Sequence, residues 1–194
     1  MLNKLRKLRE KKGFTLVELI VVIAIIAILT AVLVPLIGNW TQQAAYTTLQ
    51  DAAQTVSNTV NEAISKVVAG GAPLASTITS ITGTKSAAGA NQLNITVGTA
   101  TAKADDAKAA NNIPQNVALE IAKMLDATMP NQCAFTATIS NGAVSGVVYT
   151  TSSSTAPGTT GITKNDNFNE AYEQSGAAIG VTGIYKVASS TPSP

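Results

Sequence analysis

The hydrophobic pattern of the first 70 residues changes close to Trp40. From Leu19 to Trp40 the chain carries no ionisable side chain, and about 20 such residues are long enough, as an α-helix, to cross the hydrocarbon core of a bilayer. Beyond Trp40 the apolar residues recur at steps of three and four, which is typical of a helix with one buried face. These positions are Ala45, Leu49, Ala52, Val56, Val60, Ile64 and Val67.

Both patterns are helical, and we expect one continuous helix from Phe14 to Val68, roughly 80 Å long at 1.5 Å per residue. Its amphipathic half, residues 41–70, should pack its apolar face on a folded domain and turn its polar face to water or to other chains. Gly70-Gly71 and Pro73 should end the helix. The polar residues between the apolar positions are Gln42, Gln43, Thr48, Gln50, Asp51, Asn58, Asn61 and Glu62.

Residues 71–194 have the shorter elements expected of a globular domain. The clearest signal is a β-hairpin in which Ser140-Asn141-Gly142 joins the runs Gln132–Ile139 and Ala143–Thr150, because Asn-Gly is favoured in type I′ turns. Asn91–Val97 alternates as a strand does, and Ile179–Val187 is a candidate for the last strand.

One helix is expected inside this domain, beginning near Asn112 or Ile113 with Pro114 at its start and ending before Pro130. Its apolar stripe consists of Val117, Ile121, Met124 and Leu125. Residues 150–163 are rich in Ser, Thr and Gly without an apolar period and predict a surface loop, and residues 189–194 predict a flexible tail. These elements predict an α+β fold, with antiparallel strands laid over the amphipathic half of the long helix.

Positive charge is concentrated ahead of the apolar segment. The six basic residues before Gly13 should stay on the cytoplasmic side of a membrane and orient the apolar helix outward. The chain after Gly13 has seven lysines and ten acidic residues, a net side-chain charge of −3, which does not support specific nucleic-acid binding. The six are Lys4, Arg6, Lys7, Arg9, Lys11 and Lys12.

The junction between the basic and apolar segments carries the most specific motif of the chain. Gly13 is followed by Phe14, and Glu18 is the one charge in the apolar run that begins there. A carboxylate near the start of a membrane helix is costly in lipid and needs a partner. The run Gly13-Phe14-Thr15-Leu16-Val17-Glu18 closely resembles the processing site of type IV prepilins and the related pseudopilins.

The resemblance implies that residues 1–13 are a leader, that a prepilin peptidase cuts between Gly13 and Phe14, and that the new amine of Phe14 is methylated. It also implies that Glu18 pairs with the N-terminal amine of a neighbouring subunit during assembly. An unpaired carboxylate in an apolar filament core costs several kcal/mol, so this pairing would favour the one axial stagger that satisfies both charges. Pro35 should kink the helix, since it removes the hydrogen bond to the Ala31 carbonyl.

On this resemblance we expect the structural subunit, or pilin, of a type IV pilus that serves adhesion, motility or DNA uptake. Residues 14–40 would lie in the membrane before assembly and at the filament centre afterwards, with the head of residues 71–194 outside, the lollipop arrangement of the family. The implied partners are other copies of the chain, the prepilin peptidase, and an inner-membrane assembly platform with its ATPase. No cofactor is expected.

Two alternatives for the function stay open at this point. The first is a pseudopilin of a type II secretion or competence system, which shares every N-terminal feature. The second is a membrane-anchored binding domain that does not polymerise. For the N-terminus itself, a secretory signal peptide conflicts with the length of the apolar run, and a plain anchor does not account for Glu18 or for the Gly13-Phe14 junction.

The composition argues against an enzyme. The chain has no histidine and a single cysteine, Cys133, which removes most catalytic triads, Cys/His zinc clusters and any disulfide within one chain. We expect no catalytic residue and no metal site, and interpret Asp105-Asp106 and Asp166 with Glu170 as solvated acids because their spacing matches no EF-hand loop.

Two positions depart from the family pattern. Many pilins close the head with a disulfide, which a lone Cys133 cannot do, and this leans toward the pilins of Gram-positive bacteria or toward a minor subunit without deciding between them. We expect Cys133 to be a small buried hydrophobe. Many relatives also have a glycine where this chain has Ala27, so melting of the helix ahead of Pro35 is less favoured here.

Overall fold

The computed structural model describes residues 14–69, 76, 78–86, 92–108, 112–151, 155–168 and 171–187. They belong to two compact units, residues 1–42 and residues 43–194. Several features predicted from the sequence lie outside the described residues: the leader 1–13 with Gly13, the helix-ending Gly70-Gly71 and Pro73, Glu170, and the tail 189–194.

The first described element is the long helix α2 (Leu16–Val68). It confirms the predicted helix Phe14–Val68 to within two residues at its start. The helix continues through Pro35, so the proline does not end it. The helical hydrogen bonding extends one residue further, since Ala69 donates its backbone N–H to the Ser65 carbonyl at 2.9 Å.

The part of α2 in the second unit buries one face, as its pattern predicts. Leu49, Val56, Val60 and Ile64 are buried, as are Ala53 and Ala63 between them. Two positions were predicted wrongly: Ala45 is exposed, and Gln50 is buried although it is polar. Gln50 is tolerated there because both ends of its amide bond the backbone of Val181, so no polar atom is desolvated without a partner.

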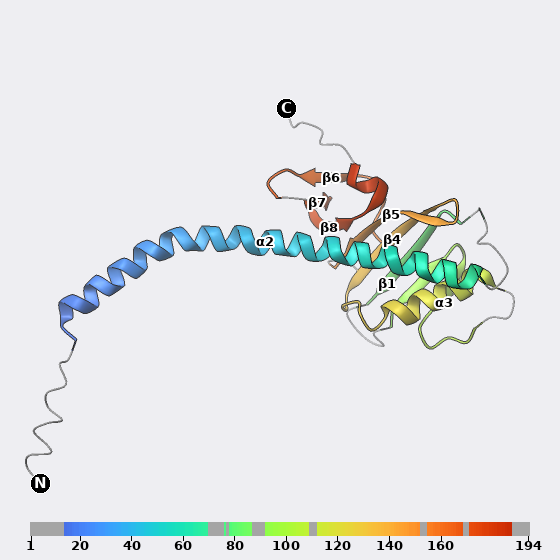
Figure 1. The fold of residues 1–194 in the computed structure, drawn as a ribbon, viewed down its shortest axis with the longest axis horizontal. Coiled ribbons are helices and arrows are strands. Elements are labelled where there is room, and N and C mark those ends of the chain that lie inside the picture. Colours follow the sequence, from blue (N-terminus) through green and yellow to red (C-terminus); the bar gives the residue numbers. More distant parts are fainter. Residues whose placement is uncertain are drawn as a thin grey trace, which may run out of the picture. The chain divides into compact units, whose positions relative to one another are not determined.

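The second unit is built on one antiparallel sheet in the order β3-β2-β1-β4-β5-β8-β7-β6, of which Figure 1 labels β1, β4, β5, β8, β7 and β6. The strong predicted hairpin lies at its centre and is confirmed as β4 and β5. At the turn, Asn141 and Gly142 have φ angles of 53° and 76°, the paired positive values that a type I′ turn requires. The strands are β1 (Ser80–Lys85), β2 (Asn94–Val97), β3 (Ala100–Ala102), β4 (Cys133–Ser140), β5 (Ala143–Thr150), β6 (Ile162–Asn165), β7 (Ala171–Gln174) and β8 (Ala177–Val181).

The predicted helix of the head is confirmed as α3 (Ile113–Leu125). The Asn112 side chain accepts a hydrogen bond from the Gln115 backbone N–H at 3.1 Å, which caps the first turn, and Pro114 follows where a missing N–H costs least. Val117, Ile121 and Leu125 are fully buried, so the stripe faces the core.

Other strand predictions were incomplete. The Asn91–Val97 strand begins at Asn94, and Ile179–Val187 divides into β8 and the 3₁₀ helix η1 (Gly183–Val187). The division occurs at Gly183, whose φ is 58°; a side chain there would collide with the Ser145 carbonyl. Four strands were not predicted: β1, β3, β6 and β7. The predicted Ser/Thr loop 150–163 was drawn too long: residues 155–161 are irregular, but Thr150 ends β5, and Ile162 and Thr163 begin β6.

The apolar side chains of the second unit form two clusters on opposite faces of the sheet. The main core lies between α2, α3 and one sheet face and includes Phe135 and Tyr149. The second cluster consists of Val148, Ile162, Tyr172, Ile179 and Val181. Val148 and Tyr149 are consecutive in β5 and therefore point to opposite faces.

A buried lysine fastens the end of α3 to the sheet. Lys85, at the end of β1, donates to the carbonyls of Asp126 at 2.6 Å and Met129 at 3.1 Å, and its Nζ lies 3.4 Å from the Asp126 carboxylate. Cys133 pairs with Lys85 across the strands and is buried and unbridged; burial raises the pKa of its thiol. The head is thus held by packing, hydrogen bonds and ion pairs, since a chain with one cysteine cannot form a disulfide of its own.

Candidate functional site

The start of α2 is closed by three hydrogen bonds between Thr15 and Glu18. The Glu18 carboxylate accepts from the Thr15 backbone N–H at 2.8 Å and from the Thr15 hydroxyl at 2.8 Å. The hydroxyl oxygen in turn accepts from the Glu18 backbone N–H at 3.2 Å. This is the capping box of a Thr-x-x-Glu sequence, which satisfies two of the N–H groups that a helix start leaves without intrahelical partners.

The carboxylate that family resemblance assigns to assembly therefore has a partner within its own chain. Glu18 is exposed in the described structure, so a cation from another molecule can reach it. Thr15 is the residue that the sequence reasoning missed. Its signal was present, since a Thr three residues ahead of a Glu at the start of an apolar run is a recognised helix start.

The helix beyond this cap presents apolar side chains in every direction. Phe14 is 87% exposed and Trp40 is 64% exposed, and the large apolar residues between them are exposed too. Exposed apolar surface of this extent is unfavourable in water, so the segment requires lipid or other helices around it. Among the described residues α2 is the helix long and apolar enough to cross a membrane.

Pro35 and its neighbours modify the hydrogen bonding of the apolar segment. Proline has no N–H to donate to the Ala31 carbonyl, four residues earlier in the same helix. Two threonine hydroxyls nearby donate to helix carbonyls, Thr30 to Ile26 at 2.6 Å and Thr41 to Gly38 at 2.9 Å. These two hydroxyls are thus hydrogen-bonded within the helix, which lowers the cost of placing them in an apolar surrounding.

Residues 8–34 match the family model described as the prokaryotic N-terminal methylation motif. The match covers Gly13, Phe14, Thr15 and Glu18 and most of the apolar segment. Together with the long apolar helix, it fits a type IV pilin or a prepilin-like protein, which includes the pseudopilins. The comparisons with curated proteins and with solved structures found no match.

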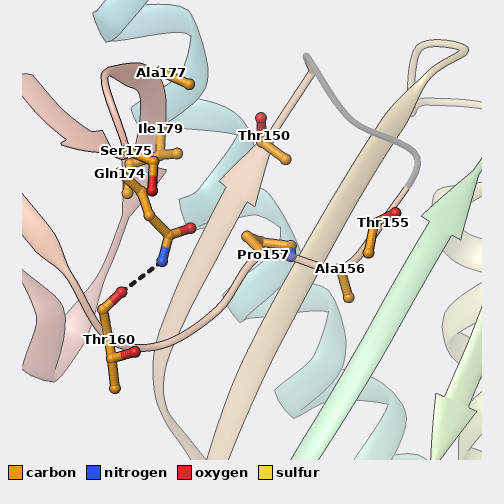
Figure 2. Close-up of a pocket in the computed structure, with 9 residues that line it drawn as sticks. All are labelled: Thr150, Thr155, Ala156, Pro157, Thr160, Gln174, Ser175, Ala177 and Ile179. Atoms are coloured by element: carbon orange, nitrogen blue, oxygen red, sulfur yellow. Dashed lines mark hydrogen bonds between the residues drawn. The ribbon is translucent and has the colours of Figure 1, made fainter.

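The second unit contains a pocket of about 480 Å³ between the end of β5 and the β7–β8 turn (Figure 2). Gln174 holds one wall, donating to the carbonyls of Thr160 at 2.7 Å and Gly158 at 3.0 Å. None of the nine described residues that line it is ionisable. They are Thr150, Thr155, Ala156, Pro157, Thr160, Gln174, Ser175, Ala177 and Ile179.

Of the acidic residues named from the sequence, Asp105, Asp106 and Asp166 are among the described residues, and the first two have local partners. Asp106 accepts from the Lys103 backbone N–H at 2.8 Å and closes a turn, while Asp105 accepts from the Gln92 side chain. Within the described part of the chain, no three His, Cys, Asp or Glu side chains are arranged to hold a metal ion.

Proposed function

We propose that this chain is a type IV pilin that polymerises into a cell-surface filament through residues 14–40. The observation that carries the proposal is the methylation motif, followed directly by a helix whose apolar side chains are exposed on all sides. The motif supports leader removal at the Gly13–Phe14 bond and methylation of Phe14. The exposed apolar surface supports the location of residues 14–40 in two apolar surroundings, first the membrane and then the centre of a filament.

The capping box suggests how Glu18 takes part in both states. Before assembly the carboxylate is satisfied by Thr15, which lowers the cost of placing it at the membrane surface. During assembly the methylated amine of a neighbour's Phe14 approaches the same carboxylate and forms a charge-assisted hydrogen bond, the stronger kind. The pair is satisfied at one axial offset between subunits, so Glu18 selects the register of the filament.

The head contributes a water-facing outer domain. The exposed residues of its α2 segment are mainly polar, charged or Ala. The hydroxyls of Thr47, Thr48 and Thr55 donate to carbonyls of their own helix. Adhesion, motility and DNA uptake are all compatible outputs of such a filament, and which of them applies depends on partners outside this chain.

A pseudopilin is the second candidate, and the same motif supports it equally. A pseudopilus subunit would be processed in the same way but would not form long surface filaments. The two functions therefore separate in one experiment: electron microscopy of cells labelled with an antibody against residues 78–187, together with mass spectrometry of the mature N-terminus.

The proposal expects long labelled filaments and a mature chain that begins at methylated Phe14. Gly13→Val should leave an uncleaved precursor in the membrane, because the peptidase loses the small residue before the cleaved bond. Processing at Phe14 without filaments would favour the pseudopilin. A mature N-terminus after Ala31 or beyond Pro35 would establish a secretory signal peptide and end both readings.

A further inference from the structure

The last three strands, β6, β7 and β8, form a lobe that is joined to the rest of the sheet over a short seam. The pairing of β5 with β8 consists of Val148 with Val181 and Tyr149 with Gly180. Thr182 continues it by one residue, donating its N–H to the Val147 carbonyl at 2.9 Å and accepting from the Val147 N–H at 3.1 Å through its hydroxyl. By contrast, β5 pairs with β4 along its whole length, from Ala143 to Thr150. Beyond the seam the strands diverge, and the pocket of Figure 2 opens between them.

The lobe also has its own small apolar cluster. Ile162, Tyr172, Ile179 and Val181 of the lobe pack against Val148 of β5, on the sheet face opposite the main core. The stability of a region follows the apolar contacts and ladder hydrogen bonds that it contains. A short seam and a small cluster make the lobe less firmly held than β1, β4 and β5.

One turn of α2, from Tyr46 to Gln50, makes further hydrogen bonds to the lobe. The Gln50 amide donates to the Val181 carbonyl and accepts from the Val181 N–H at 3.1 Å, which is how a neighbouring strand would bond it. Gly180 permits this approach, because a side chain there would collide with the Leu49 carbonyl. The same turn also places Leu49 in the main core, but most of the helix residues in that core come from the turns that follow, with Val56, Val60 and Ile64.

Tyr46 makes a second attachment, to the β6–β7 hairpin. Its hydroxyl donates to the Glu173 carboxylate, which also accepts from the Asn165 amide at 2.7 Å. Its ring lies 5.5 Å from the ring of Phe168, centroid to centroid. Figure 1 shows β6, β7 and β8 grouped apart from β1, β4 and α3. The lobe is therefore attached to the helix at two points, one on β8 and one on the hairpin.

We propose that β6–β8 form a releasable lobe, locked closed by the Tyr46–Gln50 turn of α2. Distortion of that turn frees the lobe while the main core stays folded, because the core is held by later turns of the helix. The coupling is reciprocal, so loss of the lobe loosens the helix at Tyr46–Gln50. The turn begins six residues after Trp40, where the apolar segment ends. A distortion of α2 that begins in the apolar segment would therefore reach the contacts of the lobe before it reached the later turns of the helix.

The test is amide hydrogen exchange, read by mass spectrometry, on the full-length chain in detergent micelles. Gln50→Leu keeps the volume and removes both bonds to Val181. It should accelerate exchange in residues 162–181 about tenfold or more, while β1, β4 and α3 exchange at their original rates. The matched control is Gln54→Leu, one turn along the same helix, where the side chain is exposed and bonds only Asn58 among the described contacts.

A milder variant guards against general misfolding. Tyr46→Phe removes one hydroxyl, keeps the ring against Phe168, and should give the same selective acceleration with a smaller factor. Equal acceleration in the lobe and in β4 for either variant would show one cooperative unit and overturn the proposal. Unchanged exchange in residues 162–181 would overturn it as well, since the helix turn would then not hold the lobe.

Discussion

The two halves of α2 share one backbone conformation and differ in what surrounds their side chains. From Leu16 to Trp40 the apolar residues are exposed on every side, whereas from Tyr46 to Ile64 one face is buried in the head. One helical conformation therefore serves two different surroundings. The halves differ in what their side chains contact. Those of the second half pack in the core of the head, whereas those of the first half are available to lipid or to other helices.

Each half of the helix carries one glutamate, and the two glutamates differ in their surroundings. Glu18 is capped by Thr15 at the start of the apolar half, whereas Glu62 lies exposed on the polar face of the second half. A carboxylate in water needs no partner, while one carried into an apolar surrounding does. A glutamate in the first half thus needs a partner and one in the second half does not, so the same substitution in each half can be compared directly.

The largest expected effect comes from removing the helix from the head altogether. A fragment of residues 41–194 keeps Val56, Val60 and Ile64 in the core and should be soluble, monomeric and cooperatively folded. A fragment of residues 72–194 loses that face and should expose its sheet and aggregate. Size-exclusion chromatography and thermal unfolding distinguish them; equal stability of the two fragments would mean that the helix does not hold the head.

Assembly should respond almost as strongly to Glu18. Glu18→Ala should leave membrane insertion and cleavage intact, since the segment becomes more apolar and Gly13-Phe14 is unchanged. Filament yield, measured in the sheared surface fraction, should fall to near zero because the neighbour's amine loses its partner. Glu62→Ala is the matched control and should retain filaments. A normal yield from Glu18→Ala would exclude carboxylate pairing as the determinant of register.

Two valines in the same helix give a comparison of intermediate size. Val60 is fully buried and Val32 is 67% exposed. Val60→Ala should lower the free energy of unfolding of the head by about 2 kcal/mol, through lost burial and the cavity left behind. Val32→Ala should leave it unchanged within about 0.5 kcal/mol. Denaturant unfolding in micelles measures both free energies. Similar losses of stability for the two variants would contradict the claim that only the second half of α2 stabilises the head.

Much of this architecture could be predicted from local sequence. The helix, the Asn-Gly hairpin and the capped α3 depend on neighbours within a few residues, so their signals are local. Strands β6 and β7 could not be found in this way. Ile162–Asn165 and Ala171–Gln174 are short, mainly polar segments, and their extended conformation comes from pairing with each other and with β8.

The functional residues also divide into those that local sequence reveals and those that it does not. Gly13, Phe14 and Glu18 could be named because the motif is contiguous, and Thr15 could have been named from the same six residues. Gln50 and Tyr46 could not, since their partners Val181 and Glu173 follow 131 and 127 residues later. A glutamine on the polar side of a periodic pattern gives no sign that a strand edge will meet it.

The smallest expected effect concerns the Tyr46–Glu173 contact, in the half of the helix that holds the head. The hydrogen bonds from Tyr46 and Asn165 keep the pKa of the Glu173 carboxyl below its usual value of 4.5. A lowered pKa means that the folded state favours the charged form, so this stability is present above about pH 5 and is lost as the pH falls below 4.5. Because Glu173 is partly exposed, the loss should not exceed about 0.5 kcal/mol. Unfolding free energies from pH 6 to pH 3 should therefore fall more steeply for the original chain than for Glu173→Gln. Parallel curves would mean that the contact does not depend on the carboxylate charge, and that the lobe is held through Gln50 instead.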